Sequence, residues 1–189
     1  MFYVQSNFGT QDAPKWKNPS GLTGKQLSSI DYQSKGMYVY YFSGDEEADG
    51  SMKTGTYKID LDDDTYTFTF DKHGCGLNGV NSNKVYVNGM LLTAGDDRYA
   101  VVNNIAKGAD EKDAYLVSAT GSIIKGGKYV KDANDDYYAV FNSDSEYTIW
   151  KIKDGDNASK AAKDLANNGS ASDYVGTAGV QQVFPAVVE

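Results

Sequence analysis

The chain has 189 residues, a net charge of −8, 15 Tyr, 20 Gly and a single cysteine. The negative charge argues against nucleic acid as a partner, because phosphate backbones are bound by clusters of Lys and Arg, and against docking on an anionic membrane. One cysteine excludes an intrachain disulfide, and no segment reaches the roughly 18 apolar residues that membrane insertion requires.

The composition favours an all-β fold made of short strands and many turns. A tyrosine covers apolar surface with its ring while its hydroxyl stays in water, so a Tyr-rich chain suggests a thin core that lies close to solvent. Asp outnumbers Glu in the sequence, and Asp favours turns and helix caps over helix interiors.

The N-terminal segment, residues 1–36, is predicted to be a capping segment or loop. It begins with a possible strand at residues 2–4 and continues into polar sequence around Pro14, Trp16 and Pro19. Its first residues, MFYVQ, lack the basic and apolar regions of a signal peptide. We therefore expect any export signal to lie outside this sequence.

One phrase then recurs with irregular spacing: an aromatic strand, a turn, and two glycines that enclose an apolar residue. The copies are YVYYF (38–42) with DGSMKTG (49–55), YTFTF (66–70) with GCGLNG (74–79), VYV (85–87) with NGMLLTA (88–94), and YLV (115–117) with TGSIIKG (120–126). In the third copy Ala94 replaces the last glycine. Two further strand phrases lack the full turn, at 98–102 and at 136–141 leading to 147–150.

These phrases predict β-hairpins. Alternation with a period of two places the aromatics of residues 66–70 on one face and the threonines on the other. Asn88-Gly89 is the strongest turn signal, followed by Asp49-Gly50, since such pairs adopt the positive φ of tight hairpin turns. A lone hairpin is barely stable in water. We therefore expect a solenoid-like stack of short antiparallel hairpins over residues 37–152.

The C-terminal segment, residues 153–189, is predicted to cap the array with one helix. The apolar residues that fall at helical spacing are Ala158, Ala161, Ala162, Leu165 and Ala166. Asp156 or Asn157 could cap the start of this helix, and Gly169 could end it. Residues 180–188 add a possible final strand interrupted by Pro185.

The residues YYF (40–42), DGSMKTG (49–55) and YKI (57–59) resemble the cell-wall-binding repeat family. That family includes choline-binding and glucan-binding repeats and the C-terminal repeats of clostridial toxins, with a pattern that reads roughly W-Y-Y-F, a turn and D-G-x-M-x-T-G-W. Residues 60–141 resemble the degenerate repeats of surface proteins from gut clostridia. The resemblance implies a hairpin solenoid on a Gram-positive envelope.

The resemblance also implies a ligand site, because choline-binding members hold a quaternary ammonium between hairpins by cation–π attraction. The positions that carry over are Tyr40, Tyr41 and Met52. Val39 and Thr56 stand where the family has tryptophan, so glycan binding or a purely structural role fits better than a choline cage.

Several tyrosines are candidates for stacking against sugars, although most are expected to form the core of the hairpin stack. Together with Tyr40, Tyr41 and Met52, the candidate ligand-binding residues are Tyr57, Tyr86, Tyr137 and Tyr138. Neighbours in the pairs 40–41 and 137–138 point to opposite faces of a strand, so one member of each pair should face outward.

Catalytic and metal sites are not expected. His73 and Cys75 lie in one predicted turn, whereas catalytic Cys–His pairs normally meet from distant segments. Asp clusters at 60–64, 132–136 and 154–156 could bind calcium weakly. Counted from Asp132, the EF-hand positions for Gly and Glu hold Tyr137 and Ser143, so that motif fails, and solvated turns are the simpler interpretation. We expect no catalytic residue, no metal and no cofactor.

The sequence thus favours a secreted or cell-surface module that binds cell-wall or other polysaccharide through exposed aromatics. The alternative is a structural spacer or protein-interaction stalk, with self-association through edge strands as a further option. A fragment of a larger enzyme is the third interpretation. A line of exposed tyrosines would support glycan binding, and buried or scattered tyrosines would support the spacer.

Overall fold

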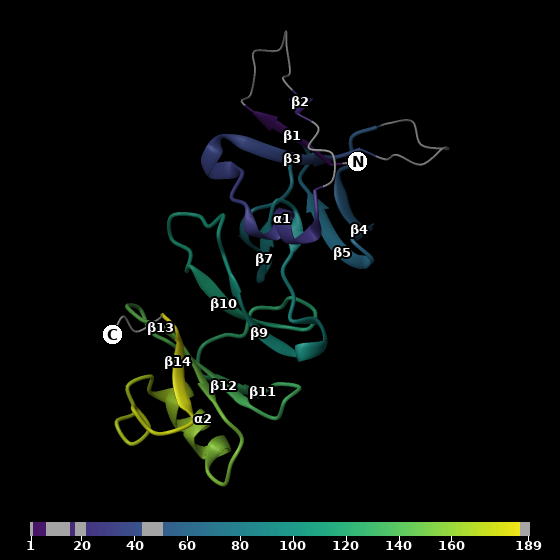
Figure 1. Ribbon diagram of the computed structural model, residues 1–189. Coiled ribbons are helices and arrows are strands. Elements are labelled where there is room, and N and C mark those ends of the chain that lie inside the picture. The colour runs from purple at the N-terminus through teal and green to yellow at the C-terminus, as the bar shows by residue number, and fades with distance from the viewer. Residues whose placement is uncertain (1, 7–15, 18–21, 43–50, 186–189) are drawn as a thin grey trace. The chain divides into compact units, whose positions relative to one another are not determined.

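The computed structural model describes residues 2–6, 16–17, 22–42 and 51–185 (Figure 1). Its strands are β1 Phe2–Ser6, β2 Trp16–Lys17, β3 Met37–Tyr41, β4 Gly55–Leu61, β5 Asp64–Phe70, β6 Gly79–Asn81, β7 Lys84–Val87, β8 Met90–Leu91, β9 Tyr99–Asn103, β10 Ala114–Ser118, β11 Lys128–Lys131, β12 Tyr137–Asn142, β13 Tyr147–Ile152 and β14 Val180–Phe184. The α-helices are α1 Gly24–Ser29 and α2 Ala158–Asn167, and short 3-10 helices cover Gln33–Lys35 and Gly95–Asp97. All pairs among these strands are antiparallel, which confirms the predicted β-rich class.

The contacts group the chain into two compact units. The first unit comprises Met1–Leu92 with Asn104–Asp113, and the second comprises Thr93–Asn103 with Ala114–Glu189. The predicted array of residues 37–152 therefore contributes to both units. Its division from flanking segments at 36 and 153 stays a prediction from the sequence.

The aromatic strands of the repeated phrase lie where they were predicted, as β3, β5, β7 and β10. Strands β3, β5 and β10 were expected to pair with the segment that follows each of them. With that segment each strand, or the residue directly after it, forms an isolated bridge, which joins Phe42 to Met52, Phe70 to Gly76, and Val117 to Ile123. The main partners of β3, β5 and β10 are instead the strands β1, β4 and β9. The turn predicted at Asp49-Gly50 lies outside the described residues.

Two sheets and α1 enclose the core of the first unit. One sheet has the order β2-β1-β3 and the other the order β4-β5-β8-β7-β6. Phe68 and Phe70 of β5 are buried and Thr69 between them is half-buried, so the predicted alternation is confirmed. The core cluster consists of Phe2, Val4, Leu27, Val39, Ile59, Phe68, Phe70 and Met90.

Three hairpins of this unit close through two-residue turns in which both residues have positive φ. The turns are Asp62-Asp63, Ser82-Asn83 and Asn88-Gly89. Only the last was predicted as a hairpin turn, and residues 60–64 were expected to form a solvated turn. Asp and Asn tolerate this backbone region better than other non-glycine residues, because their short polar side chains form local hydrogen bonds. The aspartates at 62 and 63 are therefore turn residues.

Helix α1 is fixed at both ends by two of these turns. Its first turn is closed by a capping box between Thr23 and Gln26, and the Gly24 N–H donates to the Asp62 carboxylate at 2.5 Å. At the other end the Asn88 side chain donates to the carbonyls of Leu27 and Ile30 at 2.7 and 2.6 Å. Because a helix of six residues has little stability of its own, these bonds and the burial of Leu27 hold it in place.

We predict that Asn88→Gly lowers the free energy of unfolding by about 1–3 kcal/mol, because it leaves two helix carbonyls without their donors. Glycine keeps the positive φ of position 88, so the change isolates the side-chain bonds from backbone strain. Urea unfolding measures the loss. The matched control is Asn83→Gly, at the exposed turn with the same conformation, where we expect a change within about 0.5 kcal/mol. An equal loss of stability from Asn88→Gly and Asn83→Gly would contradict the stabilising role of the two Asn88 hydrogen bonds to α1.

The second unit is built on the sheet β11-β12-β13-β14, which is covered on both faces. Helix α2 packs on the face that carries Ala139, Trp150 and Ile152. The opposite face, with Val140 and Ile149, packs in one cluster with Leu116 of the β9–β10 hairpin. Residues 147–150 are all buried, as expected where neighbours along a strand point into two covered faces.

Helix α2 confirms the helix predicted near the C-terminus. The five apolar residues at helical spacing are all buried. Asn157 occupies the N-cap position without a capping hydrogen bond from its side chain, and the helix ends at Asn167 with Asn168 as C-cap. Gly169 is one residue beyond the cap, where a Cβ would lie 2.7 Å from the Phe141 ring, so space requires the glycine there. Strand β14 ends directly before Pro185.

Candidate functional site

The seven candidate residues are distributed over both units and over core and surface. Tyr40, Tyr86 and Tyr138 are buried. Tyr41, Tyr57 and Tyr137 are half-buried, and Met52 is 39% exposed. The first five in sequence, Tyr40, Tyr41, Met52, Tyr57 and Tyr86, belong to the first unit, and Tyr137 and Tyr138 belong to the second.

The three residues carried over from the choline-binding pattern have neighbours of their own. The Tyr40 hydroxyl accepts a hydrogen bond from the Cys75 thiol at 3.2 Å. The Tyr41 ring lies 5.0 Å from that of Phe2 and stacks at 6.2 Å on Phe70. Both tyrosines are thus occupied in packing, and Met52 is the member of this set with the most exposed side chain.

Cys75 does not pair with His73. Both the His73 and Cys75 N–H groups donate to the Asp71 carboxylate, which closes the turn between β5 and Gly76. Burial raises the pKa of the Cys75 thiol, and the hydrogen bond with Tyr40 opposes that shift only in part. A nucleophilic cysteine needs a lowered pKa, so this environment is the opposite of an activated one.

We predict that alkylation of Cys75 by iodoacetamide in the folded protein has its pH inflection above the ordinary thiol value. The thiolate is the reactive form, and burial disfavours it, so a higher pH is needed to generate it. The rate can be measured by mass spectrometry across the pH range. The same chain unfolded in urea serves as the control, and an inflection in the folded protein below that of the unfolded chain would contradict the assignment.

The acidic cluster at residues 132–136 is engaged in a turn and in contacts with lysine. One Asp132 oxygen accepts from the N–H groups of Asn134 and Asp136 at 2.9 Å. The Lys151 ammonium lies 3.6 Å from Asp132 and 3.3 Å from Asp136, so it already supplies positive charge to these two carboxylates. The Asp154 N–H and the Lys151 ammonium hold the pKa of Asp136 below its ordinary value. Across the described residues, no group of three or more His, Cys, Asp or Glu side chains is placed to hold a metal ion.

The second unit carries an exposed aromatic pair on the edge of its sheet. Tyr129 of β11 is 41% exposed, and its ring centroid lies 6.5 Å from that of the half-buried Tyr137 on β12. The Lys131 ammonium is 5.4 Å from the Tyr137 centroid and pairs with Asp135 at 3.0 Å. Tyr129 was not among the predicted site residues. Its signal in the sequence is the short segment KYVK, a strand with lysines at both ends, which is typical of an edge strand.

A continuous row of side chains leads from this pair across the sheet. Lys131 is opposite Tyr137, Tyr137 is opposite Ile152, and Ile152 is opposite Val180. Facing residues of an antiparallel pair share one side of the sheet, and Tyr137, Ile152 and Val180 all contact the cluster beneath α2. Four strands at their usual spacing extend the row over about 14 Å.

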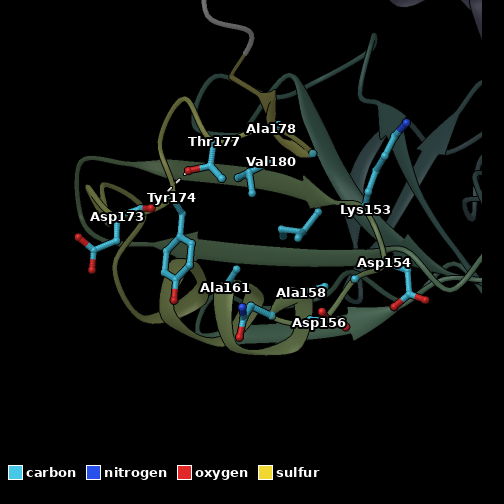
Figure 2. Close-up of a pocket in the computed structure, with 14 residues that line it drawn as sticks. Lys153, Asp154, Asp156, Ala158, Ala161, Asp173, Tyr174, Thr177, Ala178 and Val180 are labelled. Atoms are coloured by element: carbon cyan, nitrogen blue, oxygen red, sulfur yellow. Dashed lines mark hydrogen bonds between the residues drawn. The ribbon is translucent and has the colours of Figure 1, made fainter.

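The row ends in a pocket of about 330 Å³ beside the start of α2 (Figure 2). Its apolar lining comes from Ile152, Val180, Ala158 and Ala161, with the Tyr174 ring on one side. The remaining lining residues are Lys153, Asp154, Gly155, Asp156, Asn157, Asp173, Thr177, Ala178 and Gly179. An apolar pocket with a few polar groups at its rim is the usual form of a small-ligand site.

Comparisons with family models, with curated proteins and with solved structures gave no match. In the part of the chain that the structure describes, no helix is long and apolar enough to cross a membrane. The functional assignment therefore depends on the geometry of the site itself.

Proposed function

We propose that this chain is a non-catalytic module of a secreted or cell-surface protein that binds cell-wall or other polysaccharide through Tyr129 and Tyr137. The observation that carries the proposal is the exposed ring of Tyr129 on the sheet edge, beside the half-buried ring of Tyr137. The resemblance to cell-wall-binding repeats supports the same class of ligand; it is specific at residues 40–59 of the first unit and looser over residues 60–141, which extend into the second unit.

The chemistry of the pair suits a sugar chain. A pyranose ring presents an apolar face of C–H groups and a rim of hydroxyls, so it packs on an aromatic face and hydrogen-bonds at its edge. Tyr129 offers such a face at low entropic cost, since its side chain has few rotatable bonds. The Lys131 ammonium and the Asp135 carboxylate beside Tyr137 supply a donor and an acceptor for hydroxyls.

We predict that Tyr129→Ala weakens binding to an insoluble glycan by about tenfold or more, because the most exposed ring of the pair is lost. Retention on purified Gram-positive cell walls and on β-glucan and chitin particles measures the effect. Tyr129→Phe keeps the ring and should retain binding. Val175→Ala removes another strongly exposed apolar side chain among the described residues of the second unit and serves as the matched control.

The second candidate function is a structural spacer or protein-interaction stalk. It is favoured by the burial of Tyr40, Tyr86 and Tyr138, since those rings serve the cores of the units and face no ligand. Absence of retention on every wall and glycan tested, with a folded protein, would refute the glycan proposal and leave this one.

Our proposal also includes the arrangement of the hairpins as a solenoid-like stack. A compact chain of 189 residues has a radius of gyration of about 16 Å, and a rod of stacked hairpins has a larger one. We predict a value clearly above about 16 Å from small-angle scattering of the monomer. Scattering at several concentrations separates this elongation from self-association through sheet edges, and a value at the compact limit would contradict the stack.

A further inference from the structure

We infer that the pocket beside α2 is a second subsite of the same glycan surface, which takes one further ring of the bound chain and prefers a neutral or amine-bearing sugar to an acidic one. This inference rests on the proposed function. It adds a site that includes none of the seven candidate ligand-binding residues predicted from the sequence.

The position of the pocket supports one continuous site. Ile152 and Val180 line the pocket and are also the last two members of the row that begins at Lys131 and Tyr137. Ile152 is only 3% exposed beneath α2, so a chain stacked on Tyr129 and Tyr137 does not lie along the row itself. It reaches the pocket past the exposed residues Asp154 and Gly155 that follow β13, over about 14 Å. Ligand rings at both places would lie against the same face of one sheet.

The aromatic wall of the pocket is held in place by α2. The Tyr174 hydroxyl donates to the Asp164 carboxylate at 2.8 Å and lies 2.9 Å from the Lys160 ammonium, while Lys160 and Asp164 also pair with each other at 2.9 Å. Lys160 lies near the hydroxyl end, 5.5 Å from the ring centroid, so it does not cover the faces of the ring. A ring fixed by its hydroxyl loses little entropy when a sugar packs against it.

The floor and the rim of the pocket match the two kinds of surface on a sugar. Ala158, Ala161, Ile152 and Val180 offer small apolar contacts for C–H groups. At the rim, the side chains of Asp156 and Asn157 form no hydrogen bond or ion pair with other described residues and remain available to hydroxyls.

The charge at the rim decides between classes of sugar. Three aspartates and one lysine line the pocket, and Figure 2 shows the Lys153 side chain directed away from it. The nearby ammonium groups of Lys131 and Lys160 are already paired with Asp135 and Asp164. Asp154 is also close enough to Lys131 for its charge to raise the pKa of that lysine. With three aspartates against one lysine the rim still carries net negative charge, so a uronic acid would enter against like charge, whereas a neutral or amine-bearing ring would not.

The test fills the pocket and leaves the aromatic pair intact. Ala178→Phe places a large side chain at an exposed lining position, and Ser172→Phe places the same side chain at an exposed position of the same loop outside the lining. Calorimetry with cello-, laminari-, chito- and chitosan-oligosaccharides of graded length, and with oligogalacturonate, measures binding. We expect affinity to rise with length until the pocket is reached. We also expect Ala178→Phe to remove that rise, with a loss of about tenfold for the longer chains, and Ser172→Phe to bind as the unchanged protein does.

The outcomes separate this inference from the function on which it rests. If Tyr129→Ala abolishes binding and Ala178→Phe has no effect at any length, the glycan function stands and the second subsite is refuted. If oligogalacturonate binds as tightly as the neutral chains, the charge preference is refuted. If no oligosaccharide binds the unchanged protein, the proposed function and the subsite both fail.

Discussion

Covering both faces of the β11–β14 sheet is the constraint on which the second unit depends. Alternate side chains of β12 and β13 point into two different cores, one beneath α2 and one against the β9–β10 hairpin. Since neither face of the central strands is available, Tyr138 is buried although it stands next to the half-buried Tyr137. What remains for a ligand is the sheet edge at β11 and the end of the row beside α2.

The same constraint explains which parts of the structure could be predicted from the sequence. The period-two aromatic strands and the helical spacing of residues 158–166 are local patterns, and both were found as predicted. Strand partners are not local: β3 pairs mainly with β1, and β5 with β4, which the repeated phrase did not indicate. Tyr137 and Tyr138 point to opposite faces, as neighbours on a strand do, but each face is covered, so Tyr138 is buried and Tyr137 is only half-buried. In the pair 40–41, Tyr40 is buried and Tyr41 is half-buried.

The turns show that the same residue type is compatible with several structural roles until its contacts are known. Asp62 and Asp63 looked like members of a calcium cluster or a solvated turn, and they form a tight hairpin turn, with the Asp62 carboxylate accepting from the start of α1. Asn88 was predicted as a turn residue, but its buried side chain also caps the end of α1 from a distant part of the sequence. No pattern within a few residues of Asn88 contains that contact.

The candidate site follows from this division between core and surface. Most tyrosines of the repeated phrase are occupied as packing residues, so abundance of Tyr is a poor guide to ligand binding in this chain. Tyr129 and Tyr174 differ because one lies on an edge strand and the other on a loop fixed to α2 by Lys160 and Asp164. An aromatic ring can receive a sugar only where its own unit leaves one face uncovered and still restrains its side chain. These two positions come closest to meeting both conditions, and both lie on the side of the sheet that α2 covers: Tyr129 is opposite Ala139 of the cluster beneath α2, and Tyr174 packs against that cluster.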